Sequence, residues 1–202
     1  APVQAAPVDP FGPGRTGALR VDRYGVTLPL PDFPSWTLAE DGVWSTATHD
    51  KSSTIVRVRR FEETSLVGRR ECETRALMSG ALPAALLDRQ RAETLSRPSG
   101  STFEVLTDEL LRRPRGWDGR RIVALESEPS GQLAGHVALL AGTRHSCLVV
   151  HAVSRAPGER ERNANLLAER LEVLSSVTLG GLTVDRAAAP EDPTLPTVPL
   201  PL

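Results

Sequence analysis

The clearest hydrophobic pattern lies in three short segments in the second half of the chain. Residues 120–127, 133–141 and 147–154 are rich in Val, Leu, Ile and Ala, and the turn-forming stretches 128–132 and 142–146 separate them. Apolar runs of this length between turns are typical of β-strands. These segments therefore predict a three-stranded antiparallel meander.

The last two of these strands predict a sheet with two apolar faces. If Ala141 pairs with Leu148, their side chains alternate between the faces. One face then carries Gly135, Val137, Leu139, Leu148, Val150 and Ala152, and the other carries His136, Ala138, Leu140, Cys147, Val149 and His151. Because both faces are apolar enough to need cover, we expect an α+β fold with helices on both sides of one antiparallel sheet.

Strand and helix patterns also fill the rest of the central region. Strands are predicted at 24–30, 35–39, 43–49 and 53–60, with the second and third joined by an Asp41-Gly42 turn. Helices are predicted from Thr64 or Ser65 to about Met78, at 83–95 and at 160–177. Residues 102–111 fit a helix through Phe103, Leu106 and Leu110, and fit a strand through Phe103, Val105 and Thr107.

Proline gathers at both ends of the chain. Residues 1–19 and 183–202 are predicted to be Pro-rich tails around a single domain at 20–182. In the second tail Pro190, Pro193, Pro196 and Pro199 recur every third residue, so they would line one ridge of a polyproline II helix. Such a ridge suits docking to a protein partner or to another copy of this chain, and it equally suits a stiff spacer.

The cysteines favour a compartment outside the cytoplasm. The chain begins at Ala1 and its only methionine is Met78, which favours a removed signal peptide or a trimmed chain. The pair Cys72 and Cys147 then favours a disulfide, whose loop of roughly 75 residues is worth ~4 kcal/mol in the chain-entropy model. The alternative is two buried free thiols.

Charge and hydropathy exclude two classes of partner. The formal net charge of −1 provides no electrostatic attraction for nucleic acid or for an anionic membrane. No apolar run approaches the ~20 residues that a membrane span requires. We therefore expect a protein partner or a homo-oligomer, with no nucleic acid and no membrane span.

Catalytic and cofactor motifs are absent from the sequence. It contains no Gly-x-Ser-x-Gly elbow, His-Glu-x-x-His helix, phosphate loop or dinucleotide fingerprint, so neither a catalytic residue nor a cofactor is predicted. His136 and His151 would be diagonal neighbours about 7 Å apart on one sheet face. They are weak candidates for a zinc or copper site, because two ligands do not complete one. His49 and His145 are expected to be plain turn residues.

Tryptophan offers a different kind of candidate site. Trp36 and Trp44 would be credible anchors for a protein partner if either ring were exposed beside the sheet. Packing inside the core is the alternative use of a large aromatic ring. Together with the four C-terminal prolines, these two residues complete the predicted partner-binding set.

The order of the elements resembles a known fold. The resemblance rests on the segment YGVTLPLPDFPSWTL, the late meander and the closing helix NLLAERLEVLSSVTL, which together span residues 24–179. These pieces are similar to the fold shared by the PsbP subunit of photosystem II, the Ran-binding Mog proteins and bacterial DcrB-like proteins. The segment RRECETRALM also resembles uncharacterised secreted lipoproteins of GC-rich Gram-negative bacteria, whose acylated cysteine would have to precede Ala1.

The resemblance implies a protein-binding role and brings no catalytic residue. We expect a non-catalytic binding or assembly subunit of the cell envelope or of an extracellular structure. A second hypothesis is a cytoplasmic chaperone or adaptor for secreted effectors, which would keep both thiols free. A third is a hydrolase or a metal-binding protein that uses the His136/His151 face. A count of free thiols separates the first two, and the metal content of the purified protein tests the third.

Overall fold

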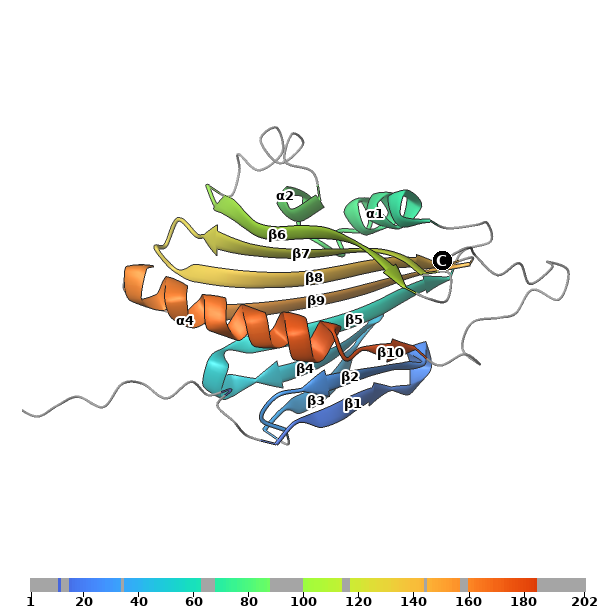
Figure 1. Ribbon diagram of the computed structural model, residues 1–202, viewed down its shortest axis with the longest axis horizontal. Coiled ribbons are helices and arrows are strands. Elements are labelled where there is room, and N and C mark those ends of the chain that lie inside the picture. The colour runs from blue at the N-terminus through green and yellow to red at the C-terminus, as the bar shows by residue number, and fades with distance from the viewer. Residues whose placement is uncertain are drawn as a thin grey trace, which may run out of the picture.

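The main sheet of the molecule has seven antiparallel strands in the order β3-β4-β5-β9-β8-β7-β6 (Figure 1). The computed structural model describes residues 11, 15–33, 35–62, 68–87, 100–113, 117–143, 145–156 and 160–184. The strands are β3 (Thr37–Asp41), β4 (Trp44–His49), β5 (Thr54–Glu62), β6 (Thr102–Arg113), β7 (Trp117–Ser127), β8 (Leu133–Thr143) and β9 (Ser146–Ala156).

A smaller sheet and a few helices complete the described fold. The smaller sheet has the order β1-β2-β10, with β1 (Gly17–Val21), β2 (Val26–Leu30) and β10 (Thr183–Val184). The helices are α1 (Arg69–Met78), α2 (Ala84–Leu87) and α4 (Arg160–Val173), and α4 continues into the π-helical segment η3 (Leu174–Leu179). The short 3-10 turns are η1 (Asp22–Tyr24) and η2 (Asp50–Ser52).

Both faces of the main sheet are covered, as the sequence predicts. The observed pairing of Ala141 with Leu148 is the predicted register. The face of Val137, Leu139 and Val150, here termed the α4 face, packs against α4, η3 and the smaller sheet. The opposite face, termed the α1 face, packs against α1 and α2. Figure 1 shows α4 crossing one side of the sheet and α1 and α2 lying on the other. The expected α+β architecture is therefore confirmed.

A glycine allows α4 to approach the sheet closely. A Cβ atom built on Gly135 of β8 would lie 2.7 Å from a methyl carbon of Leu171 in α4. Any larger side chain at this position would push the helix away from β8, because two carbon atoms cannot approach so closely in a packed core. Leu171 itself is only 1% exposed. The small residue in the middle of β8 therefore sets the distance between helix and sheet.

The disulfide joins α1 to the α1 face. Cys72 lies in the middle of α1 and Cys147 at the start of β9, with their Cα atoms 5.3 Å apart. Both residues are completely buried, among Ala76, Leu140 and Val149. The bond therefore staples a short helix to the central strands from inside the core.

Several boundaries differ from the sequence-based ones. The ambiguous stretch 102–111 is the strand β6, because it pairs with β7 along its whole length. Helix α1 begins at Arg69, where the Glu71 side chain accepts a hydrogen bond from the Gly68 amide at 3.0 Å. The helix predicted at 83–95 is described only as the single turn of α2, and the remainder lies outside the described residues.

Two strands extend into the stretches predicted to be tails. β1 begins at Gly17, and its alternate residues Leu19 and Val21 are buried against the main sheet. β10 pairs with β2 through Thr183 and Val184. The alternation of apolar and polar residues over 17–21 is short, and the neighbouring prolines obscure it. The ordered region therefore reaches beyond the limits of 20–182 that composition suggests.

Candidate functional site

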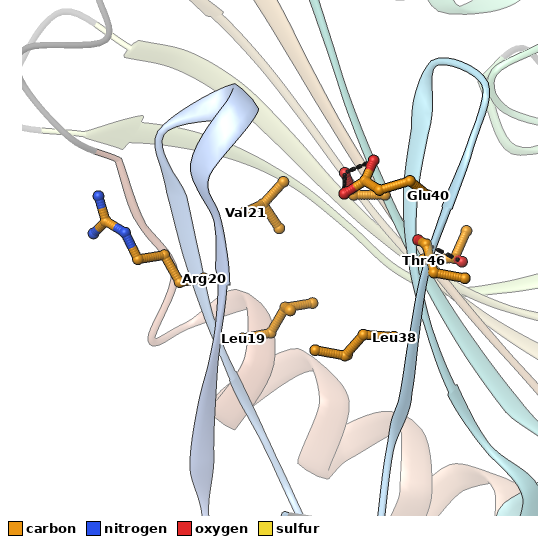
Figure 2. A pocket seen from close by; sticks show the side chains of 8 residues that line it. Leu19, Arg20, Val21, Leu38, Glu40 and Thr46 are labelled. Carbon is orange, nitrogen blue, oxygen red and sulfur yellow. Dashed lines mark hydrogen bonds between the residues drawn. The ribbon is translucent and has the colours of Figure 1, made fainter.

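The described surface is hollowed between the edge strands of the two sheets. Leu19 and Val21 of β1 face Leu38 and Glu40 of β3 across a space of about 200 Å³, and β4 contributes its floor. Figure 2 shows the apolar side chains from the two strands pointing into the same gap. We term this space the edge groove. It is lined mainly by aliphatic side chains, and Glu40 supplies a carboxylate at one end.

The sequence of β3 explains why the groove stays open. All five residues of Thr37–Asp41 are exposed, so this strand contributes little to the core. Leu38 is 52% exposed although it lies on the same side of the sheet as the buried Ala47, its cross-strand partner. Among the described strands, β3 pairs only with β4 and β1 pairs only with β2. The edge groove is therefore bordered by two strand edges whose outer backbone groups have no described strand partner.

Hydrogen bonds close one end of the groove. Arg23 in η1 donates to the Glu40 carboxylate at 2.5 Å and to the Gly42 carbonyl at 2.9 Å. The Tyr24 hydroxyl donates to the carbonyl of Val43, in the same turn. These contacts tie the smaller sheet to the β3–β4 hairpin and hold the groove at a fixed width. Such a preformed concave site avoids part of the ordering free energy that binding otherwise requires.

A row of four hydrogen-bonded side chains crosses the α1 face from β5 to β7. Arg57 Nη2 lies 3.2 Å from His151 Nδ1, His151 Nε2 lies 3.1 Å from His136 Nδ1, and His136 Nε2 lies 2.7 Å from Glu126 Oε2. Both histidines are buried, and Phe103 of β6 packs on His136 with ring centroids 5.5 Å apart. We term these four residues the histidine row. The predicted diagonal neighbours thus contact each other directly.

The proton positions in the histidine row follow from its ends. An arginine can only donate, so His151 Nδ1 must accept and the proton of His151 lies on Nε2. That proton is donated to His136 Nδ1, so the proton of His136 lies on Nε2 and is donated to the Glu126 carboxylate. Every ring nitrogen is therefore satisfied while both histidines are neutral. The row connects the guanidinium of Arg57 to the carboxylate of Glu126 through two aligned imidazoles.

The surroundings of the histidine row favour the neutral form of His151. Burial lowers the pKa of His151 well below 6.5, because desolvation disfavours the charged ring, and the positive charges of Arg57 and Arg155 act in the same direction. The hydrogen bond from His136 lowers the pKa of Glu126 below its ordinary value. The row is therefore organised for the state in which only its two ends are charged.

A second polar network lies under the smaller sheet. His49 Nε2 lies 2.9 Å from Asp32 Oδ2, and His49 Nδ1 lies 2.7 Å from the Ser52 hydroxyl. Ser52 continues to Thr54 at 2.7 Å, and Thr54 continues to Ser154 at 2.9 Å. The hydrogen bond from His49 is the main reason that the pKa of Asp32 is lowered. His49 is thus a completely buried network residue, and the expectation of a plain turn residue is wrong.

The Asp32–His49–Ser52 group has the residue types of a hydrolase triad but lacks its access. Ser52 is 1% exposed, and its hydroxyl is engaged with both His49 and Thr54. A catalytic serine must present its oxygen to a substrate carbonyl. In this structure the network instead joins η2 to β5 and β9, and the missed signal was the close run of His, Ser and Thr at 49–54.

Solved structures share the architecture that carries these features. The solution structure of cyanobacterial PsbP (CyanoP) from Synechocystis sp. PCC 6803 covers 92% of this chain and 100% of its own, with a TM-score of 0.51 and 13% sequence identity. The fold is PsbP-like. A protein from Bacteroides thetaiotaomicron VPI-5482 covers 84% of this chain with a TM-score of 0.45 and 10% identity, and this chain spans about half (48%) of its length. No protein-family profile matches the chain. No curated protein matches it either.

The PsbP-like domain uses its tryptophans differently from the prediction. Trp36 is 7% exposed and packs against His49 and Phe11, with ring centroids 5.0 and 6.1 Å away. It therefore serves the core and is not an exposed partner anchor, because Phe11 and His49 pack against its ring. Trp44 is half-buried, with the guanidinium of Arg57 4.7 Å from its ring centroid.

Other predicted site residues have mixed outcomes in the PsbP-like domain. The disulfide between Cys72 and Cys147 is present. The ring nitrogens of His136 and His151 are engaged in hydrogen bonds, and the described residues contain no group of three or more His, Cys, Asp or Glu arranged to hold a metal ion. The four prolines at 190–199 lie outside the described residues. None of the described helices is long and apolar enough to cross a bilayer.

Proposed function

We propose that this PsbP-like domain is a non-catalytic protein-binding subunit that works outside the cytoplasm and receives an extended segment of its partner at the edge groove. The observation that carries the proposal is the exposed strand β3 beside a preformed aliphatic groove. An extended peptide can add a strand to such an edge, with backbone hydrogen bonds providing affinity and alternate side chains providing specificity. The half-exposed Leu38 supplies most of the apolar surface for one inserted side chain, and the largely buried Leu19 and Val21 form the opposite wall.

The size and charge of the groove define the partner segment. A space of about 200 Å³ accepts one aliphatic side chain and is too small for most cofactors or drug-sized ligands. Burying such a side chain contributes about 1.5–3 kcal/mol. The Glu40 carboxylate at one end already pairs with Arg23, so an acidic residue of the partner would be disfavoured there. We therefore expect an extended, uncharged segment with a central Leu, Ile or Val.

A non-catalytic role is supported by the placement of the reactive residue types. The buried groups that could act as acids, bases or nucleophiles, His49, Ser52, His136 and His151, are committed to hydrogen bonds with neighbouring side chains. All four are less than 5% exposed. A catalytic group must reach its substrate within hydrogen-bonding distance. These networks instead connect strands, which suits a rigid scaffold for binding.

An extracytoplasmic location is supported by the disulfide. Structural disulfides form and persist in oxidising compartments and are rare in the cytosol. The Cys72–Cys147 bond lies inside the core and is shielded from solvent, unlike the exposed bonds that serve redox exchange. A chaperone that stays in the cytoplasm with two free thiols fits this arrangement less well. The resemblance to secreted lipoproteins remains a prediction.

Replacing Leu38 by Asp should weaken peptide binding at least tenfold while leaving the fold intact. Residue 38 is 52% exposed, so the change removes apolar contact from the groove without opening the core. The probe is a fluorescent extended peptide selected from a displayed library of random 12-residue sequences. Its affinity is measured by fluorescence polarisation, and hydrogen exchange then shows whether the bound peptide protects the amides of β3.

The matched control is Met78→Asp, which introduces the same charge at a residue 83% exposed at the end of α1. This variant should bind the peptide as the unmodified protein does. Protection of amides elsewhere than β3, or equal affinities of the Leu38 and Met78 variants, would contradict the assignment of the groove. Failure of the library to yield any binding peptide would contradict the protein-binding role of this edge.

A further inference from the structure

The opposite edge of the main sheet is long and exposed. β6 spans Thr102–Arg113, whereas the edge strand β3 has only five residues. No described strand pairs with the outer edge of β6. Natural edge strands are usually short or interrupted by proline, lysine or bulges, which prevent pairing with other chains. β6 contains neither proline nor lysine, and its bulge lies between Val105 and Thr107, so the half that follows the bulge is regular.

The regular half of β6 carries an exposed leucine at its centre. Leu110 is 64% exposed and lies on the same face of the sheet as its cross-strand partner Arg120. An acidic residue, Asp108, stands two positions before it, and a basic residue, Arg112, stands two positions after it. Alternate residues of a strand share a face, so the order acid, leucine, base is read along one face of this edge.

We propose that two copies of this chain pair through β6, antiparallel and centred on Leu110, so that their main sheets form one continuous sheet. A two-fold axis perpendicular to the sheet places Leu110 of one copy opposite Leu110 of the other. The same axis places Asp108 of each copy opposite Arg112 of its partner. Cross-strand apolar pairs and opposite charges both stabilise a sheet. The Asp108 carboxylate also accepts two hydrogen bonds from Arg120 of β7, at 2.8 and 2.9 Å, which fix its position on this face of the sheet.

Neighbouring registers are less favourable. In any other two-fold register, each residue must pair with a residue two positions further along the partner strand. A change of one position would place side chains of opposite faces against each other. One shift places Glu109 opposite Glu109, and the next places Asp108 opposite Asp108. Like charges directly opposite each other destabilise an antiparallel pair. A shift in the other direction places Leu110 opposite Arg112 and Leu111 opposite Leu111. Leu111 already packs against the core of its own chain, so this register leaves the exposed Leu110 without an apolar partner.

The β6 pairing is independent of the edge groove. β6 and β3 are the two opposite edges of the seven-stranded sheet, with five strands between them. A dimer through β6 therefore leaves the groove beside β3 open in each copy. The dimer would present two partner-binding edges at its outer ends, and a failure of either proposal leaves the other unaffected.

Replacing Leu110 by Lys should raise the dissociation constant of the dimer at least tenfold. Sedimentation velocity of the full chain over a range of concentrations measures that constant, and circular dichroism confirms the fold of each variant. Lysine places two like charges opposite each other at the centre of the pairing and is the residue that natural edges use to prevent it. The control Met78→Lys introduces the same charge at another exposed site and should leave the dimer unchanged.

Cross-linking tests the register directly. Leu110→Cys should form a disulfide-linked dimer under mild oxidation, because directly opposite Cβ atoms are roughly 4.5–5.5 Å apart in an antiparallel pair. Leu38→Cys, at the other edge, should remain monomeric under the same treatment. The native cysteines do not interfere, since both are buried in their own disulfide. A protein that is monomeric at every concentration, or a Leu110→Cys variant that cross-links no faster than Leu38→Cys, overturns the proposal.

Discussion

Replacing Cys72 and Cys147 together by Ala should lower the free energy of unfolding by about 2–5 kcal/mol. The two cysteines are 75 residues apart in the sequence, so their bond restricts a large part of the unfolded chain. For a loop of this length the chain-entropy model predicts about 4 kcal/mol. Domains of this kind are stable by about 5–15 kcal/mol in total. The variant should therefore lose a substantial share of its stability, and the contact of α1 with β9 should be the first region to loosen.

Urea denaturation of the two proteins measures this effect. The slope of the free energy against urea should also rise in the double variant, because its unfolded chain exposes more surface without the cross-link. Unmodified protein unfolded in the presence of a reductant provides the control, since it retains both sulfur atoms and loses only the bond. Native protein that shows two titratable thiols, or equal stability with and without reductant, would contradict both the disulfide and its role.

Replacing His151 by Gln should remove up to about 2 kcal/mol of pH dependence between pH 7 and pH 5. The pKa of His151 is well below 6.5 in the folded protein, because the ring is buried and because Arg57 and Arg155 place positive charge near it. In the unfolded chain the same ring takes up a proton as the pH falls through about 6.5. The unfolded state then binds more protons than the folded state, so stability falls as the pH falls.

Glutamine suits this test because it keeps the hydrogen bonds without titrating. Its carbonyl can accept from Arg57, and its amide can donate to His136. The carboxylate of Glu126 affects stability in a lower pH range. Its pKa is lowered in the folded protein, so its contribution to the free energy of unfolding is present above about pH 4.3 and is lost only as the pH falls through the folded pKa. Measurements between pH 7 and pH 5 therefore exclude the contribution of Glu126, and the difference between the two proteins reports on His151.

Free energies of unfolding at a series of pH values provide the readout. The control is Met78→Gln, which places the same side chain at a residue 83% exposed at the end of α1 and should retain the pH dependence of the unmodified protein. If His151→Gln follows the same pH curve as the unmodified protein, then His151 is not held neutral by its surroundings. An increased acid sensitivity of the variant would contradict the sign derived above.

Local pattern was sufficient for most of the strands. The register of Ala141 with Leu148, the two apolar faces and the helices that cover them follow from a period of two in the strands and of 3.6 in the closing helix. The 102–111 stretch could not be assigned in this way, since Phe103 fits a helical period with Leu106 and Leu110 and a strand period with Val105 and Thr107. Pairing with β7 decides that it is a strand.

The candidate sites depend on contacts that no local pattern encodes. Asp32, His49 and Ser154 come from three distant segments, and their network forms only when η2 meets β9 under the smaller sheet. The edge groove likewise exists only because β1, which composition assigns to a tail, packs beside β3. Trp36 is a residue type that often anchors a partner, but its contacts with Phe11 and His49 bury it.

The sequence by itself determined the α+β class, the meander with its register and the proximity of His136 to His151, and it favoured a Cys72–Cys147 disulfide over free thiols. These follow from periodicity and from residue types that sit on known faces. Only the tertiary structure decided which strands form the edges, which polar groups are buried together and which aliphatic side chains stay exposed. The physical reason is that the order of apolar and polar residues specifies which side chains must be buried, whereas the packing of distant segments specifies what buries them.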